Sequence, residues 1–465
     1  MSNQIYMNKP PTATHSSSNI QVIRLREKIG YGFGDLASNL VWSSVAMFIV
    51  FFYTDVIGIS ASIIGTIMLF SRIFDGVTDL AFGIVVDKTK SKHGKSRPWI
   101  LWMATPFAIT TVLLYLVPNI GEGGQIVYII VTYNLLSVLY TAINIPYGVL
   151  NSLITQDQYQ RSILNVFRMI FAMLGVIIVS TVTMPLVKFL GGGQAGWVYT
   201  FGIYSILGVL LFFITFYETK ERVKPTVTVS SHNRIPLKQV LNALLKNKYW
   251  FIAVAFFVIT YIGTALLQGS AIYYAQYILK DPELIGLLTV ASIIPTLIGL
   301  LLVAPLVKKI GKRNSMIGGL LLTIIGSLII MIEPTNLTIV ILGSIIRGIG
   351  TAPVSGSKFA MLADTIEYGE WTSGVRTEGL VYSAGSMGSK IGAGLGIALI
   401  GWFLAGGGYI GGATMQTNSA LFSIKALFIY LPILISVIQI ILLSLYKLDK
   451  LYPQIIKELN ERANL

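Results

Sequence analysis

The chain has no cysteine and few charged residues. Without cysteine, it has neither a disulfide framework nor a thiolate metal site. Only 12% of the residues are charged, whereas a soluble enzyme carries about 25%. The three histidines, His15, His93 and His232, lie outside the apolar runs, and no HExxH, Walker A or Ser–His–Asp set is found. We therefore expect no enzymatic activity and no cofactor.

Apolar residues dominate instead, at 54% of 465 residues. Runs of about 20 apolar residues are long enough to cross a bilayer. We therefore expect an all-α membrane protein with twelve transmembrane helices. They are predicted near 30–54, 61–86, 98–118, 125–150, 163–189, 197–217, 249–278, 284–306, 314–333, 336–359, 377–405 and 421–446.

The longest polar stretch between these runs, 218–248, divides the chain into two bundles of six helices, 30–217 and 249–446. Two related basic turns, VVDKTKSKHGKSRPW and LVKKIGKRNSM, occupy equivalent places in the two bundles, as expected of parallel repeats. Two six-helix halves are the architecture of the major facilitator superfamily. Residues 1–29, which lack the apolar core of a signal peptide, and 447–465 are predicted tails.

The net charge of +14 does not point to nucleic acid, because the basic residues lie in short loops between the apolar runs. These loops fall on one side of the predicted bundle. The positive-inside rule therefore places both termini and the central loop in the cytoplasm of a plasma-membrane protein.

Two aspartates interrupt the second apolar run, in SRIFDGVTDL. A charge at mid-bilayer costs about 2.5–3.5 kcal/mol on insertion scales, so something must offset it. Asp75 and Asp79 share one helix face, with Arg72 and Thr78 close by. A structural ion pair with Arg72 is one interpretation. The other is a cation site, because their oxygens suit Na⁺ and two close carboxylates can share a proton.

Basic residues also lie within apolar runs, and Arg168, Lys390 and Lys358 are three of them. Arg168, in NVFRMIFAML, is a turn and a half inside its helix, so snorkelling and a functional role are both open. Lys390 lies among small residues in GSMGSKIGAGLG, which favours a cation- or substrate-site role because small residues let another helix approach. Lys358 is nearer a helix end and can snorkel.

Neutral polar and aromatic residues in the membrane suit a polyol, because sugars are bound by hydrogen-bonding side chains and an aromatic face. Interhelical hydrogen bonding is the alternative for each of them. They are Asn39, Asn144, Tyr147, Gln268, Tyr273 and Tyr274.

Motifs along nearly the whole chain resemble the glycoside–pentoside–hexuronide:cation symporters, the family of melibiose permease. They are YGFGDLASN, YTDVIGIS, RIFDGVTD, SKHGKSRPW, NIPYG, AIYYAQY and ADTIEYGEWTSGVRTEG. RIFDGVTD and the last motif are the most specific of these.

The resemblance implies roles for particular residues. In that family the helix-two aspartates bind the coupling cation, which implies Asp75 and Asp79, with Thr78 and Thr141 assisting; Na⁺ is one cation they would hold and H⁺ the other. The resemblance also places Lys390 and the sugar-contacting Arg168 at the site. The predicted substrate-binding set is Asn39, Asn144, Tyr147, Arg168, Gln268, Tyr273 and Lys390.

The chain departs from melibiose permease at four places, two of which change charge. Ser38-Asn39 replaces its lysine–aspartate pair, Asn144 its helix-four aspartate, Gly148 a tryptophan and Thr78 an asparagine. The chain looks closer to the xyloside, isoprimeverose and glucuronide members.

Losing two acids while keeping Arg168 and Lys390 makes the predicted cavity more positive, which favours an anionic sugar. Asparagine, which donates and accepts without demanding charge, suits a neutral one. We favour the neutral xyloside, because Lys358 is predicted close to the cytoplasm.

An acidic cluster is predicted in the loop after the tenth helix. A solvated loop is one interpretation; the resemblance suggests a cytoplasmic latch that pairs with the basic loop 88–97 or with Asp35. Several exposed pairs, each worth about 0–1 kcal/mol, can together bias two states. The predicted gating residues are Asp35, Arg97, Asp364, Glu367, Glu370 and Arg376.

These observations predict a secondary active transporter that couples H⁺ or Na⁺ to uptake of a xyloside such as isoprimeverose, by alternating access and as a monomer in the bilayer. A glucuronide:cation symporter is the alternative. A carrier of lysolipids or other amphiphiles belongs to a different class, and a polar Asn, Gln and Tyr cavity argues against it.

Overall fold

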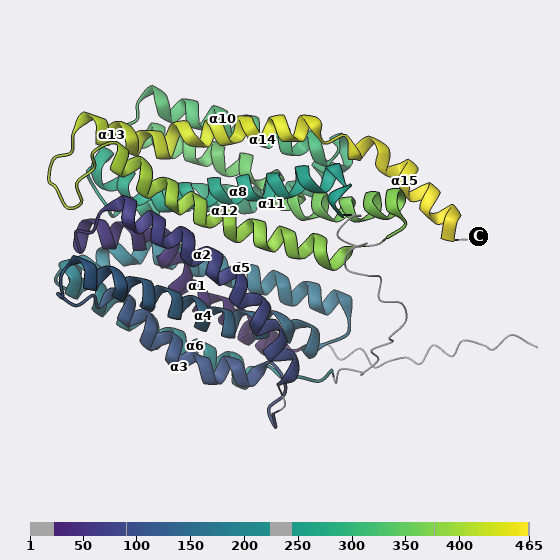
Figure 1. The fold of residues 1–465 in the computed structure, drawn as a ribbon, viewed down its shortest axis with the longest axis horizontal. Helices are drawn as coiled ribbons and strands as arrows, with labels where there is room; N and C mark the ends of the chain where they lie inside the picture. The colour runs from purple at the N-terminus through teal and green to yellow at the C-terminus, as the bar shows by residue number, and fades with distance from the viewer. Residues whose placement is uncertain (1–22, 90, 224–243, 376, 464–465) are drawn as a thin grey trace, which may run out of the picture.

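The computed structural model describes residues 23–89, 91–223, 244–375 and 377–463. Within these ranges, twelve helical spans are long and apolar enough to cross a membrane. They form two bundles that lie side by side (Figure 1). The predicted all-α fold with twelve membrane helices is confirmed. The predicted tail 1–29 and the central loop fall mostly outside the described residues.

The first half contains six spans, and the first of them ends in a π-helical turn. They are α1 (Leu25–Phe51) with η1 (Phe52–Val56), α2 (Ala61–Lys88), α3 (Arg97–Tyr115), α4 (Glu122–Ile154), α5 (Gln158–Phe189) and α6 (Gly193–Glu218).

The second half repeats this plan and adds a helix after its last span. Its elements are α8 (Lys248–Tyr273) with η2 (Tyr274–Ile278), α9 (Leu284–Ile310), α10 (Lys312–Ile332), α11 (Leu337–Ser373), α12 (Glu378–Gly406), the continuous rod α13 (Asn418–Lys425), η3 (Ala426–Tyr430) and α14 (Leu431–Leu445), and α15 (Leu448–Ala463).

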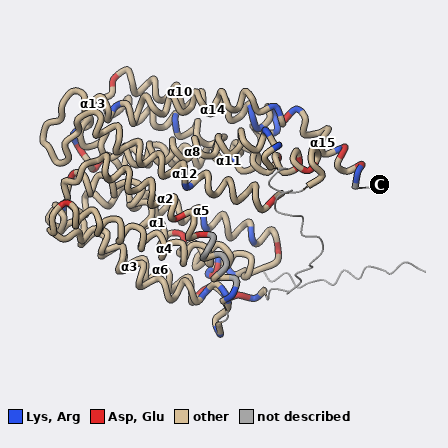
Figure 2. Tube along the Cα trace, in the orientation of Figure 1, with Lys and Arg blue, Asp and Glu red and all other residues tan. Residues whose placement is uncertain are grey.

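The first helix of each half ends in one π-helical turn, η1 in one half and η2 in the other. Both turns lie at the end of the molecule opposite the described termini, which we call the far end. The opposite end, with Ile23 and Ala463, is the terminal end. Most Lys and Arg residues lie towards the terminal end (Figure 2), as expected of the predicted basic loops.

Two segments differ from the sequence-based expectation. The predicted loop after residue 359 is wrong, because α11 continues to Ser373 and carries Asp364, Glu367 and Glu370 on a helix. A helix that leaves the apolar layer can carry charge without cost, so the end of the apolar run did not mark its end. The predicted tail from 447 forms α15, whose Ile455 is buried against the second half.

Candidate functional site

A cavity of about 520 Å³ lies between the two halves, at mid-length of the helices that line it. The first half contributes α1, α2, α4 and α5, and the second contributes α8 and α12. Part of the predicted site lines this cavity: Asn39, Asp75, Asp79, Thr141, Asn144, Gln268 and Lys390.

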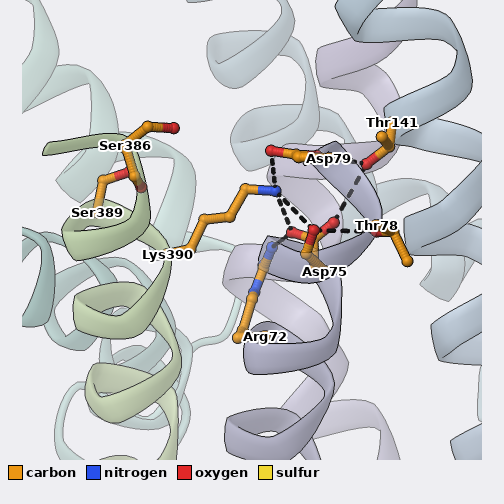
Figure 3. A network of polar contacts seen from close by, with 8 residues as sticks. All are labelled: Arg72, Asp75, Thr78, Asp79, Thr141, Ser386, Ser389 and Lys390. Carbon is orange, nitrogen blue, oxygen red and sulfur yellow. Dashed lines mark hydrogen bonds and ion pairs between the residues drawn. The ribbon is translucent and has the colours of Figure 1, made fainter. Parts of the chain in front are cut away.

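The two aspartates of α2 face a hydroxyl of α4 (Figure 3). Thr141 Oγ1 lies 2.9 Å from Asp79 Oδ1 and 3.3 Å from Asp75 Oδ1, so one hydroxyl is within reach of both carboxylates. Thr78 Oγ1 instead donates to the backbone oxygen of Asp75 at 3.0 Å. Thr141 therefore contacts the carboxylate oxygens, whereas Thr78 contacts the backbone oxygen of Asp75.

A lysine of the other half reaches this carboxylate pair (Figure 3). Lys390 Nζ of α12 lies 3.1 Å from Asp75 Oδ2 and is also paired with Asp79 Oδ2. Arg72 Nη1 lies 3.7 Å from Asp75 Oδ2, a longer ion pair. The two acids and two bases carry no net charge together. Asp75 is 2% exposed, so these cations offset the cost of burying its charge.

Glycines let α12 pack closely on α2 of the other half and on α8 of its own half, as small residues do in membrane bundles. A Cβ on Gly394 would lie 2.8 Å from the Cβ of Arg72, and one on Gly396 would lie 2.6 Å from the Ile262 backbone oxygen. Lys390 can reach α2 because α12 packs this closely on α2 and α8.

Arg168 is held within the first half. Its Nε donates to Asp35 Oδ2 at 2.7 Å, its Nη2 donates to Asn144 Oδ1 at 3.4 Å, and its Cζ lies 4.9 Å from the centroid of the Tyr147 ring. The guanidinium is tied to the cavity wall through Asn144. Asp35, predicted to act in gating, supplies its countercharge in this conformation.

Two tyrosines of the predicted substrate set lie away from the cavity lining. Tyr147 is fully buried, stacks on Tyr31 at 4.7 Å between ring centroids, and donates to the Tyr31 backbone oxygen. Tyr273 is also fully buried, at the far end, where its hydroxyl lies 2.9 Å from Thr54 Oγ1.

The cavity also contains residues that the sequence analysis did not single out. Trp42 and Tyr140 stack at 4.1 Å between ring centroids with 10° between their planes, and both line the cavity. Ser43, Tyr261, Thr264 and Ser389 line it too. Trp42 and Ser43 follow Asn39 at i+3 and i+4, which is one face of a helix, so the position of Asn39 was the available signal.

The far end is closed by contacts between η1 and the second half. Asp55 accepts hydrogen bonds from the hydroxyls of Tyr277, at 2.5 Å, and Tyr409, at 2.6 and 2.7 Å, and from the Gly412 amide at 3.3 Å. Thr54 adds the contact with Tyr273. We call these six residues the far-end seal. Burial, then Tyr273 and Asp55, raise the pKa of Tyr409, so its hydroxyl remains a donor.

Two of the predicted gating residues, Arg97 and Asp364, contact their own halves in this conformation. Arg97 donates to the Phe216 backbone oxygen at 2.6 Å, and Asp364 pairs with Lys312, each within its own half. Glu367 and Glu370 lie on α11, and Arg376 lies outside the described residues.

The sequence profile of the MFS/sugar transport protein family matches residues 30–450. The chain belongs to this family. The predicted resemblance is thereby confirmed. Since this is a family of membrane transporters, the expectation that the chain is no enzyme is confirmed as well.

Curated relatives of this sugar transport chain cover almost its whole length. It is 37% identical to the isoprimeverose transporter of Lactiplantibacillus pentosus, over 97% of this chain and 95% of that one. It is 33% identical to the putative glycoside/cation symporter YagG of Escherichia coli, over 92% of each. It is 32% identical to the Escherichia coli glucuronide carrier protein homolog, over 96% and 97%.

Solved structures share the fold of this sugar transport chain at low sequence identity. The nucleoside transporter NupG superposes with a TM-score of 0.63 at 13% identity, over 90% of this chain and 98% of that one. This similarity concerns the fold alone.

Proposed function

We propose that the chain is a cation:glycoside symporter that works by alternating access. The observation that carries the proposal is that the Asp75–Asp79 pair lines the same cavity as the neutral hydrogen-bonding residues Asn39, Asn144 and Gln268. A cation and a sugar bound there would be near neighbours, which symport requires. The relatives named as an isoprimeverose transporter and a glycoside/cation symporter support this assignment.

The charges of the carboxylate pair support cation binding. With Lys390 docked, Asp75, Asp79, Arg72 and Lys390 sum to zero. If Lys390 withdraws with α12, one negative charge is left uncompensated in the membrane, and an Na⁺ ion or a proton would neutralise it. We therefore propose that the coupling cation replaces the Lys390 ammonium at these oxygens, with Thr141 as a further ligand.

A neutral xyloside such as isoprimeverose is the substrate we propose. Asn39, Asn144 and Gln268 can each donate and accept, which suits sugar hydroxyls. Arg168 lies behind the lining residue Asn144, and we propose that it donates to the sugar through Asn144 or by direct contact. Its charge is already paired with Asp35. The three hydrogen-bonding side chains of Asn39, Asn144 and Gln268 in the lining disfavour an amphiphile carrier.

A glucuronide is the second candidate, and Lys358 is the observation that favours it. Its Nζ lies 3.4 Å from the hydroxyl of Tyr261, which lines the cavity. In the part of the chain that the structure describes, Lys358 has no carboxylate within ion-pair distance. Competition of methyl-xyloside and methyl-glucuronide against one labelled glycoside separates the two candidates: if only the glucuronide competes, the neutral preference is wrong.

The conformation fits an inward-facing state. The far end is sealed, and the basic loops predict that the terminal end is cytoplasmic. We propose that closing the terminal end brings Asp35, Arg97, Asp364, Glu367, Glu370 and Arg376 into contacts between the halves. A monomer in the plasma membrane, with both termini cytoplasmic and no cofactor beyond the coupling cation, is the working arrangement we propose.

Uptake into proteoliposomes tests the central proposal. Labelled isoprimeverose is followed with an imposed Na⁺ gradient, an imposed pH gradient, or neither. Asp75→Asn and Asp79→Asn are each expected to abolish uphill accumulation while sparing exchange. Glu283→Gln, at an exposed far-end pair with Lys188, is the control. Undiminished uphill uptake in both aspartate variants would refute the cation assignment.

A further inference from the structure

Trp42 lines the cavity and contacts two other lining residues, Arg72 and Tyr140. The Cζ of Arg72 is 4.3 Å from its ring centroid, and the Tyr140 ring stacks on it at 4.1 Å. One face of an indole has room for one planar group at such a distance, so the guanidinium and the phenol ring take opposite faces. Trp42 therefore joins a residue of the cation site to a residue of the cavity wall.

Arg72 depends on this ring for its position. It is 5% exposed, its ion pair with Asp75 is 3.7 Å long, and its Nε has no hydrogen-bond partner among the described residues. A guanidinium so weakly held by hydrogen bonds is placed largely by the aromatic face, which attracts a cation most strongly when the pair is removed from water.

The residue stacked on the other face of the indole, Tyr140, is next in sequence to a residue that contacts the same carboxylates. Tyr140 is followed on α4 by Thr141, whose hydroxyl lies 2.9 Å from Asp79 Oδ1. Tyr140 and Thr141 are consecutive residues of α4, so a shift of this part of the α4 backbone moves the Tyr140 ring and the Thr141 hydroxyl together. Trp42 itself is on α1, one turn beyond Asn39 of the cavity lining.

We propose that Trp42 is a positioning residue that couples cation occupancy to glycoside affinity, through Arg72 on one face and Tyr140 on the other. This rests on the proposed symport. Once Lys390 has withdrawn, a cation at Asp75 and Asp79 reduces the attraction that Asp75 exerts on Arg72, so the guanidinium stays on the indole as it does here. The indole and Tyr140 then take the arrangement that fits the glycoside. By linkage, the glycoside raises cation affinity by the same factor.

The test is a ratio of affinities. The Kd of isoprimeverose is measured by calorimetry without Na⁺ and with saturating Na⁺ at constant pH, and across a pH series without Na⁺. In the wild type, one of these cations is expected to change the Kd by about 5–150-fold, the usual range for coupled sites. Trp42→Leu is expected to bring that ratio within about twofold of one, while Trp42→Phe, whose ring binds a cation more weakly, gives an intermediate ratio.

A merely structural role would not change this ratio, since a damaged pocket loses affinity equally with and without the cation. Trp102→Leu is the matched control: it removes a tryptophan that is 51% exposed on α3, and the wild-type ratio is expected. If Trp42→Leu is not recovered folded, Trp42→Phe decides, and a wild-type ratio in the folded variant overturns the inference. A wild-type protein that binds isoprimeverose with no effect of Na⁺ or pH refutes the proposed symport instead.

Discussion

The carboxylate of Asp55 is predicted to keep the far end closed. It is the acceptor at the centre of the far-end seal, and its three donors from the second half are Tyr277, Tyr409 and the Gly412 amide. Asp55→Asn keeps the size of the side chain, removes the charge and turns one acceptor oxygen into an amide donor. Thr54 Oγ1 donates to the native carboxylate at 2.6 Å. The remaining amide oxygen of asparagine can still accept this hydrogen bond, so the change falls mainly on the contacts between the halves.

The size of the effect follows from the hydrogen bonds lost. A hydrogen bond to a charged group contributes about 1.5–3 kcal/mol and a neutral one about 0.5–1.5. Lowering the two tyrosine bonds from charged to neutral costs the sealed state about 2–3 kcal/mol, which is about a 30–150-fold shift towards states open at the far end.

Thiol accessibility measures this shift. Because the native chain has no cysteine, Gln268→Cys places a single thiol in the cavity, and a membrane-impermeant reagent is added from the far side only. Labelling is expected to accelerate about 30–150-fold in Asp55→Asn, by the shift above. The control is Glu283→Gln, which breaks the exposed 2.9 Å pair with Lys188 at the same end and is expected to change the rate less than about fivefold. If the two variants label at the same rate, the seal does not depend on Asp55.

Further outcomes follow from single contacts. Arg168→Lys cannot reproduce the fork that holds Asp35 and Asn144, and about a tenfold or greater loss of glycoside affinity is expected by binding titration, the effect of one charged hydrogen bond; an unchanged Kd makes Arg168 structural. Tyr273→Phe is expected to leave that Kd within about twofold of wild type, a change below about 0.4 kcal/mol, and to speed far-side labelling. Glu458→Gln weakens the 2.6 Å hydrogen bond from Trp371 Nε1, so faster hydrogen exchange in α15 is expected, with uptake preserved.

The sequence was enough to predict the spans, because the cost of exposing backbone groups to lipid makes each long apolar run a helix. Helix ends outside the apolar layer carry no such signal, so the apolar run predicts an end at 359 although α11 continues to Ser373. Pairing across the halves was also beyond the sequence: nothing local indicates that Lys390 meets Asp75, 315 positions away.

Helix geometry explains the two tyrosines that lie outside the lining. Tyr273 follows Gln268 by five residues, which places it about 140° around the helix and about 7.5 Å further along, so it meets the far-end seal. Tyr147 is closer in angle to Asn144, but the stacked ring of Tyr31 takes it into the core. Both tyrosines are flanked by apolar residues in the sequence, and this does not indicate whether a side chain points to the cavity or to the core.

The charge of the cavity differs from the expectation based on the replaced residues. The replacement of acids by Asn39 and Asn144 suggested a more positive cavity, but Asp35, one turn before Asn39, pairs with Arg168. Asp35 therefore neutralises Arg168 from a position one helical turn before Asn39. Within the described residues, the positive charge beside the cavity that lacks a carboxylate partner is instead that of Lys358, which the sequence analysis treated as a snorkelling residue.

The helix α11 is long enough to project beyond the apolar layer of the membrane. Its 37 residues span about 55 Å at 1.5 Å per residue, well beyond the roughly 30 Å apolar layer. If the halves pivot about the far-end seal, displacement grows with distance from that pivot and is greatest at the projecting tip. Trp371, near this tip, donates a hydrogen bond to Glu458 of α15. We therefore expect α15 to move together with the tip of α11. A spectroscopic label on α15 would therefore report the rocking of the halves with the largest amplitude.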